Sequence, residues 1–151
     1  MTKVAVLSDT HGLLREDVKK ILRDTDVILH AGDINTPMIV EELESFAPLY
    51  VVRGNNDKEW AEHLPVSLVL ELENLRIYIT HNKKHIPKDL ENIDIVVFGH
   101  SHKYLVETKD NITFINPGSC GKRRFDLEIS MCIMTINHGT FEIEKVVFQN
   151  T

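Results

Sequence analysis

The sequence predicts an α/β protein made of two packed β-sheets with helices on the outside. In residues 3–52, short apolar runs alternate with segments whose apolar residues recur at helical spacing, as expected of strands joined by helices. After residue 65, apolar and polar residues alternate, as in strands with one buried face. The length of 151 residues suits a single domain. We therefore expect residues 1–151 to form one domain.

The first half of the chain predicts a β-α-β-α-β order. Three continuous apolar runs are typical of strands covered on both faces: residues 4–7, 27–29 and 49–52. Between the first two runs, residues 14–22 place their apolar side chains on one helical face. Thr36 and Pro37 predict the N-cap and first turn of a second helix, which Pro48 ends. Short connections of this kind imply parallel strands with right-handed crossovers.

The second half predicts mainly antiparallel strands. Residues 66–72 and 75–79 should form a hairpin around a turn at Glu73 and Asn74. Pro87 to Asn92 is expected to be a short helix, followed by an apolar strand at residues 95–98. From Tyr104 onward we expect a β-meander with turns near residues 110–111 and 137–139. Its strands are predicted at residues 104–108, 112–115, 127–136 and 140–148.

The composition narrows the classes of function. The net charge is −6, from 23 acidic and 17 basic residues, which argues against binding of long nucleic acids through their phosphates. No apolar run approaches the ~18 residues of a membrane span, and the N-terminus has no signal-peptide pattern. Cys120 and Cys132 are too few for a disulfide framework. We expect a cytoplasmic protein without membrane partners; a homo-oligomer remains open.

Five of the apolar segments end in residues that commonly bind metal ions. These residues are Asp9 and His11, Asp33, Asn55, His81, and His100 and His102. Because ligands gather beyond the carboxyl ends of parallel strands, we expect these side chains to meet. Oxygen and imidazole ligands without thiolates suit manganese, iron or zinc rather than a structural zinc site. Seven ligands exceed what one ion can use, whereas two ions that share a bridging carboxylate would use them all.

The charges of such a site predict its chemistry. Asp9 and Asp33 would leave about +2 on a pair of divalent ions, counting formal charges with neutral imidazoles. That surplus should attract an anion and lower the pKa of a bridging water, and both effects favour attack on a phosphate ester. The residues therefore indicate a phosphoesterase.

The motifs resemble those of the calcineurin-like metallophosphoesterase superfamily. Asp-x-His, Gly-Asp, Gly-Asn-x-Asp, His and Gly-His-x-His follow in this order, and Asn-Pro-Gly-Ser at 116–119 is similar to the small bacterial and archaeal phosphodiesterase branch. The resemblance implies a four-layer αββα sandwich of two mixed β-sheets flanked by helices. It also implies a phosphodiesterase with two divalent metal ions, manganese first and zinc, iron or nickel as alternatives, acting on a small phosphodiester.

The resemblance assigns the ligands and the nucleophile. One ion would be held by Asp9, His11, Asp33 and His102, and the other by Asp33, Asn55, His81 and His100. A hydroxide that bridges the ions would attack, and Asn55, Asn56 and His81 are the candidate catalytic residues. Many relatives carry histidine at the position of Asn56, and an amide cannot deliver a proton at neutral pH. We therefore expect weak turnover of esters with poor leaving groups. Asn82 stands where relatives often have glycine.

Several neighbouring residues have two interpretations each. Asp57 could orient a ligating histidine or cap the segment after it, and His30 could orient a ligand or simply be a satisfied buried histidine. Contact with the site is left open for five residues: Arg53, Cys120, Lys122, Arg123 and Arg124. Two alternative functions also remain: a protein-interaction scaffold similar to the retromer subunit family, and a phosphomonoesterase.

Overall fold

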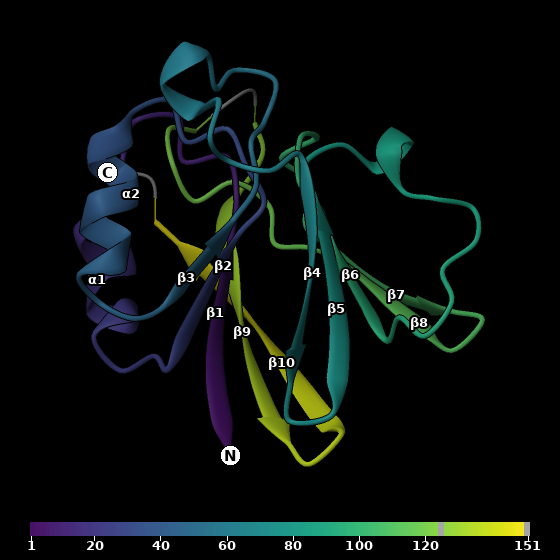
Figure 1. Cartoon of the computed structure of the whole chain (residues 1–151). Helices are drawn as coiled ribbons and strands as arrows, with labels where there is room; N and C mark the ends of the chain where they lie inside the picture. Colours follow the sequence, from purple (N-terminus) through teal and green to yellow (C-terminus); the bar gives the residue numbers. More distant parts are fainter. Residues whose placement is uncertain (124–125, 150–151) are drawn as a thin grey trace.

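Two five-stranded mixed sheets face each other in the computed structural model, which describes residues 1–123 and 126–149 (Figure 1). The first sheet contains, in spatial order, β10 (Thr140–Phe148), β9 (Ile129–Asn137), β1 (Thr2–Leu7), β2 (Val27–His30) and β3 (Leu49–Val51). The second contains β4 (Ser67–Leu72), β5 (Leu75–Thr80), β6 (Ile95–Val97), β8 (Ile112–Asn116) and β7 (Leu105–Lys109). The predicted α/β architecture with two mixed sheets is confirmed.

Two α-helices cover the first sheet on the side away from the second (Figure 1). They are α1 (Glu16–Leu22) and α2 (Pro37–Glu44), and the strands that they connect run parallel, as predicted. The Thr36 hydroxyl accepts a hydrogen bond from the Met38 amide at 3.0 Å, which confirms the predicted N-cap. Among the described residues, no helix combines the length and the apolar character that crossing a membrane requires.

The core between the sheets follows from the alternation of side chains along the strands. Val4 and Val6 of β1 point towards the second sheet, where they pack in one cluster with Ile77 and Ile79 of β5. The intervening Ala5, together with Leu7, belongs to the cluster beneath the helices. Full burial of each such valine or leucine stabilises the fold by about 1.5–3 kcal/mol. Both faces of β1 are therefore buried, as its continuous apolar run predicted.

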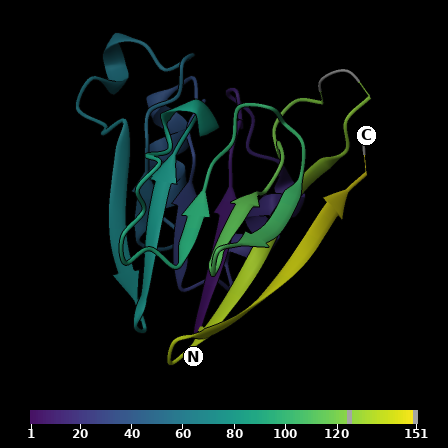
Figure 2. The ribbon, with the colours of Figure 1, turned by 90° about the vertical axis from the view of Figure 1, so that its right-hand side faces the viewer.

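The expected meander after Tyr104 was wrong, because its strands divide between the two sheets. β7 and β8 form a hairpin in the second sheet, whereas β9 and β10 form another in the first. The connection after β8 crosses from one sheet to the other, so β9 pairs antiparallel with β1. Figure 2 shows this arrangement from the side of the second sheet.

The outer layer over the second sheet is thinner than the layer over the first. The expected helix from Pro87 to Asn92 does not form, since Leu90 is the only apolar residue there apart from the proline and leaves no face to bury. The chain instead makes a short 3-10 turn, η2 (Lys83–His85). A second 3-10 turn, η1 (Glu59–Ala61), lies in the connection from β3 to β4.

Candidate metal centre

Six of the predicted ligands form two groups beyond the carboxyl ends of the strands. The first group is Asp9, His11 and His102, and the second is Asp33, His81 and His100. Within each group the candidate ligand atoms all lie within 4.8 Å of one another. The seventh predicted ligand, Asn55, has its Oδ1 3.3 Å from Nδ1 of His100. The structure therefore brings all seven residues to one place.

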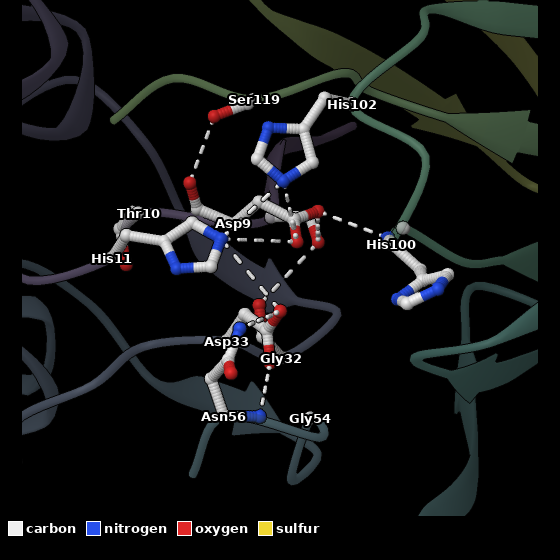
Figure 3. A network of polar contacts seen from close by, with 12 residues as sticks. Asp9, Thr10, His11, Gly32, Asp33, Gly54, Asn56, His100, His102 and Ser119 are labelled. Carbon is white, nitrogen blue, oxygen red and sulfur yellow. Dashed lines mark hydrogen bonds and ion pairs between the residues drawn. The ribbon is translucent and has the colours of Figure 1, made fainter. Parts of the chain in front are cut away.

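The first group is buried and compact. Asp9 Oδ1 lies 3.6 Å from His11 Nε2 and 3.4 Å from His102 Nε2, and the two imidazole nitrogens lie 3.3 Å apart. In Figure 3, a nitrogen of each ring faces the carboxylate of Asp9. The three side chains thus point ligand atoms at a common point that solvent barely reaches.

Asp33 faces both groups. Its Oδ2 lies 3.2 Å from His81 Nε2 in the second group and 3.6 Å from His11 Nε2 in the first. His81 Nδ1 lies 2.8 Å from the Ala31 carbonyl oxygen, which can only accept a hydrogen bond. Nδ1 therefore carries the hydrogen, and Nε2 is the nitrogen directed at Asp33. This geometry suits a carboxylate shared by two ions.

The donor set fits divalent metal ions. Among the described residues, Asp9 Oδ1 is a buried carboxylate oxygen with no hydrogen-bond partner. Such atoms are costly in a folded protein unless something else satisfies them. A cation that carboxylate and imidazole atoms coordinate would do so, and these atoms suit first-row divalent ions.

The backbone at the ligands is in an unfavourable conformation. Five candidate ligands have positive φ angles, of 55° at Asp9, 46° at His11, 61° at Asp33, 75° at His100 and 63° at His102. Residues with side chains rarely adopt this region, and such strain collects at functional sites. Backbone bonds hold the loops there: the Asp9 amide donates to the Gly32 carbonyl at 2.9 Å and the His11 amide to the Asp33 carbonyl at 3.0 Å.

Asp57 anchors the loop that carries Asp33. Its Oδ2 accepts from the amides of Asp33 and Gly54, both at 2.9 Å. Its Oδ1 accepts from the amides of Ile34 at 2.9 Å and Asn35 at 2.8 Å. The interpretation of Asp57 as a partner of a histidine was wrong, because both oxygens are occupied by backbone donors. The alternative, a cap on the segment after it, was also wrong, because the segment that it caps lies 22 to 24 positions earlier in the chain.

His30 joins two ligand loops from beneath. Its Nδ1 accepts from the Gly32 amide at 3.0 Å, so the ring hydrogen is on Nε2, which lies 3.1 Å from the Thr10 hydroxyl. The ring is fully buried, and burial lowers its pKa to about 4, against the opposing charges of Asp57, Asp9 and Asp33. His30 is thus a neutral buried histidine that also positions its neighbours.

The Asn-Pro-Gly-Ser segment ties the second sheet to the first. Asn116 donates from Nδ2 to the Gly99 carbonyl at 3.2 Å and to the Ser101 hydroxyl at 3.1 Å, which fixes the loop around His100. Ser119 donates to the Asp9 carbonyl at 2.8 Å. These bonds link the two ligand groups through backbone rather than through the ligands themselves.

Asn56 points at the shared carboxylate. Its backbone amide donates to Asp33 Oδ1 at 2.9 Å and its side-chain amide to Asp33 Oδ2 at 3.1 Å (Figure 3). Gly54 allows this close approach, since a Cβ there would lie 2.2 Å from Asp33 Oδ1. The side chain of Asn56 therefore orients Asp33.

The charges of Asp33 and His81 stabilise each other. Burial disfavours ionisation of Asp33, but its hydrogen bond to His81 and the charges of His81 and His11 hold its pKa below the usual range. Burial likewise disfavours the imidazolium of His81, yet the hydrogen bond to Asp33 and the charges of Asp9 and Asp33 raise its pKa. Without metal, both pKa shifts favour the charged forms of the pair; a metal ion would replace the proton on His81.

Two cavities flank the ligand groups. Arg53 and His85 line a cavity of about 180 Å³ together with Asn55 and His81. Asn82 borders it and also borders a larger cavity of about 430 Å³ next to His100. Arg53 thus reaches the site, as one of its two interpretations proposed.

Of the predicted basic cluster, the described residues Lys122 and Arg123 line neither of these cavities. Arg123 donates to the Leu127 carbonyl and lines a surface hollow with Phe148. Lys122 is exposed, and Arg124 is outside the described residues. Cys120 is fully buried in the core beneath the helices, and burial raises its pKa to about 12, so its thiol is inert.

The larger cavity contains three lysines that the sequence interpretation missed: Lys83, Lys84 and Lys103. Lys83 and Lys84 follow β5, whereas Lys103 follows β6. They meet only because those two strands lie side by side in the second sheet. A search for runs of basic residues in the sequence finds neighbours along the chain, so it could not find lysines that are neighbours only in space.

Comparison with known proteins identifies similar chains and folds. A family model of the calcineurin-like phosphoesterase superfamily domain matches residues 2–139. A probable metallophosphoesterase of Methanothermobacter thermautotrophicus is 32% identical over 130 residues, which cover 77% of this chain and 76% of the relative. A phosphodiesterase of Methanocaldococcus jannaschii is 30% identical over 141 residues, covering 78% and 84%. Among solved structures, Vps29 of Chaetomium thermophilum superposes with a TM-score of 0.79 at 19% identity, covering 98% of each chain.

Proposed function

We propose a reaction for this chain, which belongs to the calcineurin-like phosphoesterase superfamily. It is a phosphodiesterase that hydrolyses small phosphodiesters with two divalent metal ions. One observation carries the proposal: Asp33 Oδ2 lies 3.6 Å from His11 Nε2 of the first ligand group and 3.2 Å from His81 Nε2 of the second. The phosphodiesterase name of the M. jannaschii relative supports the same reaction.

In this proposal the two ions divide the ligands as the sequence motifs suggest. Asp9, His11, Asp33 and His102 would hold one ion, and Asp33, Asn55, His81 and His100 the other, with manganese as the preferred metal. When bound, the ions supply charge that attracts a phosphate and lowers the pKa of a water held between them. Loss of a ligand should therefore abolish activity.

The residues of the chain prepare the site for this chemistry. Asn56 fixes the orientation of Asp33 with two hydrogen bonds, and the Ala31 carbonyl fixes the ring of His81. Asp57 and His30 hold the loops that carry Asp33 and Asp9. Such support keeps ligands in place before metal or substrate arrives, which is the condition for efficient catalysis.

The position of Asn56 favours diesters with acidic leaving groups. Its amide is engaged with Asp33 and has no acidic proton to give to a departing alkoxide. A good leaving group departs without that proton, whereas an alkoxide would not, in a diester or a monoester alike. A monoester would also bring a dianion, which needs more room and more positive charge, and we therefore place phosphomonoesters second among the substrates.

A purely structural role is the competing function. The similarity to Vps29, at 19% identity, concerns the fold alone. Against that role, all seven ligand positions of this chain carry residues that can bind a metal, and their atoms converge. The two buried thiols without a disulfide support the expected cytoplasmic location.

The decisive experiment compares two chromogenic esters on metal-stripped protein with manganese added back. We expect manganese-dependent release of p-nitrophenolate from bis-p-nitrophenyl phosphate and much less from p-nitrophenyl phosphate. His100→Ala should abolish the reaction, and His63→Ala, an exposed histidine outside the site, should leave it unchanged.

Three other outcomes would change the proposal. Comparable activity on the monoester would make the protein a phosphatase. Silence on both esters with two manganese ions bound would indicate a narrow substrate range, and silence without bound metal would favour the scaffold. Full activity of His100→Ala would refute the ligand assignment.

A further inference from the structure

The larger cavity beside the ligand groups has a composition unlike that of the rest of the protein. It has a volume of about 430 Å³, which is the size of a small-molecule site. Lys83, Lys84 and Lys103 line it, and no aspartate or glutamate of the described residues does. The whole chain carries a net charge of −6, so this concentration of positive charge is local.

The three lysines are free to bind an anion. Their side chains are exposed, and in the described part of the chain none has a carboxylate within 4.0 Å of its ammonium group. Other lysines, such as Lys19 between Glu16 and Glu42, are neutralised by ion pairs. A pocket lined by charge of one sign raises the local concentration of the opposite charge.

The other walls combine polar residues near the metal centre with an apolar part formed by Phe98 and Leu105. Phe98 and Leu105 also line an adjoining hollow of about 410 Å³, which extends to Phe114 and is bordered by Glu107 and Lys109 as well. Lys83 and Lys84 line both spaces. Leu105 is 40% exposed, so apolar surface is available to a ligand. His100 forms the other border of the cavity, which places the lysines next to a predicted metal ligand.

The position of the lysines is built into the fold. Asn82 Oδ1 accepts from the Lys84 amide at 3.0 Å and so caps the 3-10 turn that carries Lys83 and Lys84. The Ser101 hydroxyl accepts from the Lys103 amide at 3.3 Å. Asn82 thus has a role that glycine, frequent here in relatives, could not perform, because it holds a basic turn at the rim of the site.

We propose that this lysine pocket, formed by Lys83, Lys84 and Lys103, binds a second phosphate group carried by one arm of the phosphodiester substrate. The inference rests on the proposed function and narrows its substrate to diesters with an additional phosphate on an apolar or aromatic arm. Lysine ammonium groups act as mobile point charges, which suits a phosphate that can turn. The apolar walls accommodate the part of the arm between the two phosphates.

Two nucleotides that differ by one phosphate test the proposal. Adenosine 3′,5′-bisphosphate and adenosine 5′-monophosphate are compared as inhibitors of manganese-dependent hydrolysis of bis-p-nitrophenyl phosphate. In the wild type we expect the bisphosphate to inhibit at least tenfold more tightly. Lys83→Gln combined with Lys103→Gln should weaken inhibition by the bisphosphate at least tenfold and inhibition by the monophosphate less than threefold.

A matched variant separates local from global charge. Lys20→Gln combined with Arg23→Gln also removes two positive charges, but at α1, on the far side of the first sheet. This variant should change neither inhibition constant. Equal inhibition by both nucleotides in the wild type, or equal effects of the two double variants, would overturn the proposal. If the wild type does not hydrolyse the ester, the proposed function fails, and calorimetric binding of the two nucleotides to the same proteins still decides the lysine pocket.

Discussion

Replacement of Asp57 by asparagine is the sharpest test of how the site is held together. The carboxylate accepts four backbone hydrogen bonds, two at each oxygen, and the side chain is only 6% exposed. Asparagine has one oxygen and one NH2 group in the same shape. If the NH2 group replaces Oδ2, the buried amides of Asp33 and Gly54 lose their acceptor and face another donor. If it replaces Oδ1, the buried amide of Ile34 and the part-buried amide of Asn35 do so.

The structure gives the size of the effect. A buried donor left without a partner costs about 1–3 kcal/mol, so two such donors should lower the free energy of unfolding by about 2–6 kcal/mol. This is a large part of the stability of an ordinary domain, which is about 5–15 kcal/mol. With a urea m-value of about 2 kcal/mol/M, the unfolding midpoint should fall by about 1–3 M.

The measurement is urea unfolding of the metal-stripped protein, followed by circular dichroism. Asp26→Asn is the matched control: Asp26 is exposed and accepts one bond, from the Lys3 amide at 2.8 Å, which the asparagine oxygen can keep. We expect that control to cost less than about 1 kcal/mol. If the two variants lose the same stability, the anchoring role of Asp57 is refuted.

Three further predictions concern protons. His30 has a pKa of about 4 in the folded protein, whereas a histidine of the unfolded chain takes up a proton near pH 6.5. The free energy of unfolding of the metal-stripped protein should therefore fall by up to about 3 kcal/mol as the pH drops from 6.5 to 4. His30→Gln should flatten this dependence of stability on pH. Because the pKa of His81 is raised, its ion pair with Asp33 stabilises the metal-stripped protein at low pH and is lost as the pH rises through that pKa. Manganese should therefore bind more tightly at higher pH and displace a proton from His81. The displaced proton should appear in calorimetry as a binding heat that depends on the buffer. Asn56→His should raise turnover of diesters with poor leaving groups by about 10²-fold or more, with little gain on bis-p-nitrophenyl phosphate; equal gains on both would exclude proton donation as the cause.

The meeting of Asp9 and Asp33 could be predicted because it depends only on the order of strands within one sheet. Asp9 and Asp33 each follow a continuous apolar run, and parallel neighbours in a sheet must bring such ends together. The same reasoning could not reveal the role of Asp57, because its partners are backbone amides that every residue has. Only the tertiary structure shows which amides need an acceptor.

The errors in the fold have a similar cause. Alternating residues after Tyr104 predict strands but not the sheet to which each strand belongs, so the division between β8 and β9 was missed. The segment from Pro87 to Asn92 has the length and the opening proline of a helix, but it lacks apolar residues to bury. Without an apolar face to pack against the core, the local preference for a helix was not enough to form one.

The position of β1 in the first sheet has a consequence for how the chain folds. One of its neighbours is β2, made soon after it, but the other is β9, which lies near the opposite end of the chain. Until the ribosome has released residues 129–137, β1 keeps an open edge, and the Asp9 loop lacks its bond from Ser119. Pairings between such distant segments form slowly, because a long loop must close first. The loop just after β1, which carries Asp9, therefore reaches its final geometry late in folding, once the pairing with β9 has formed.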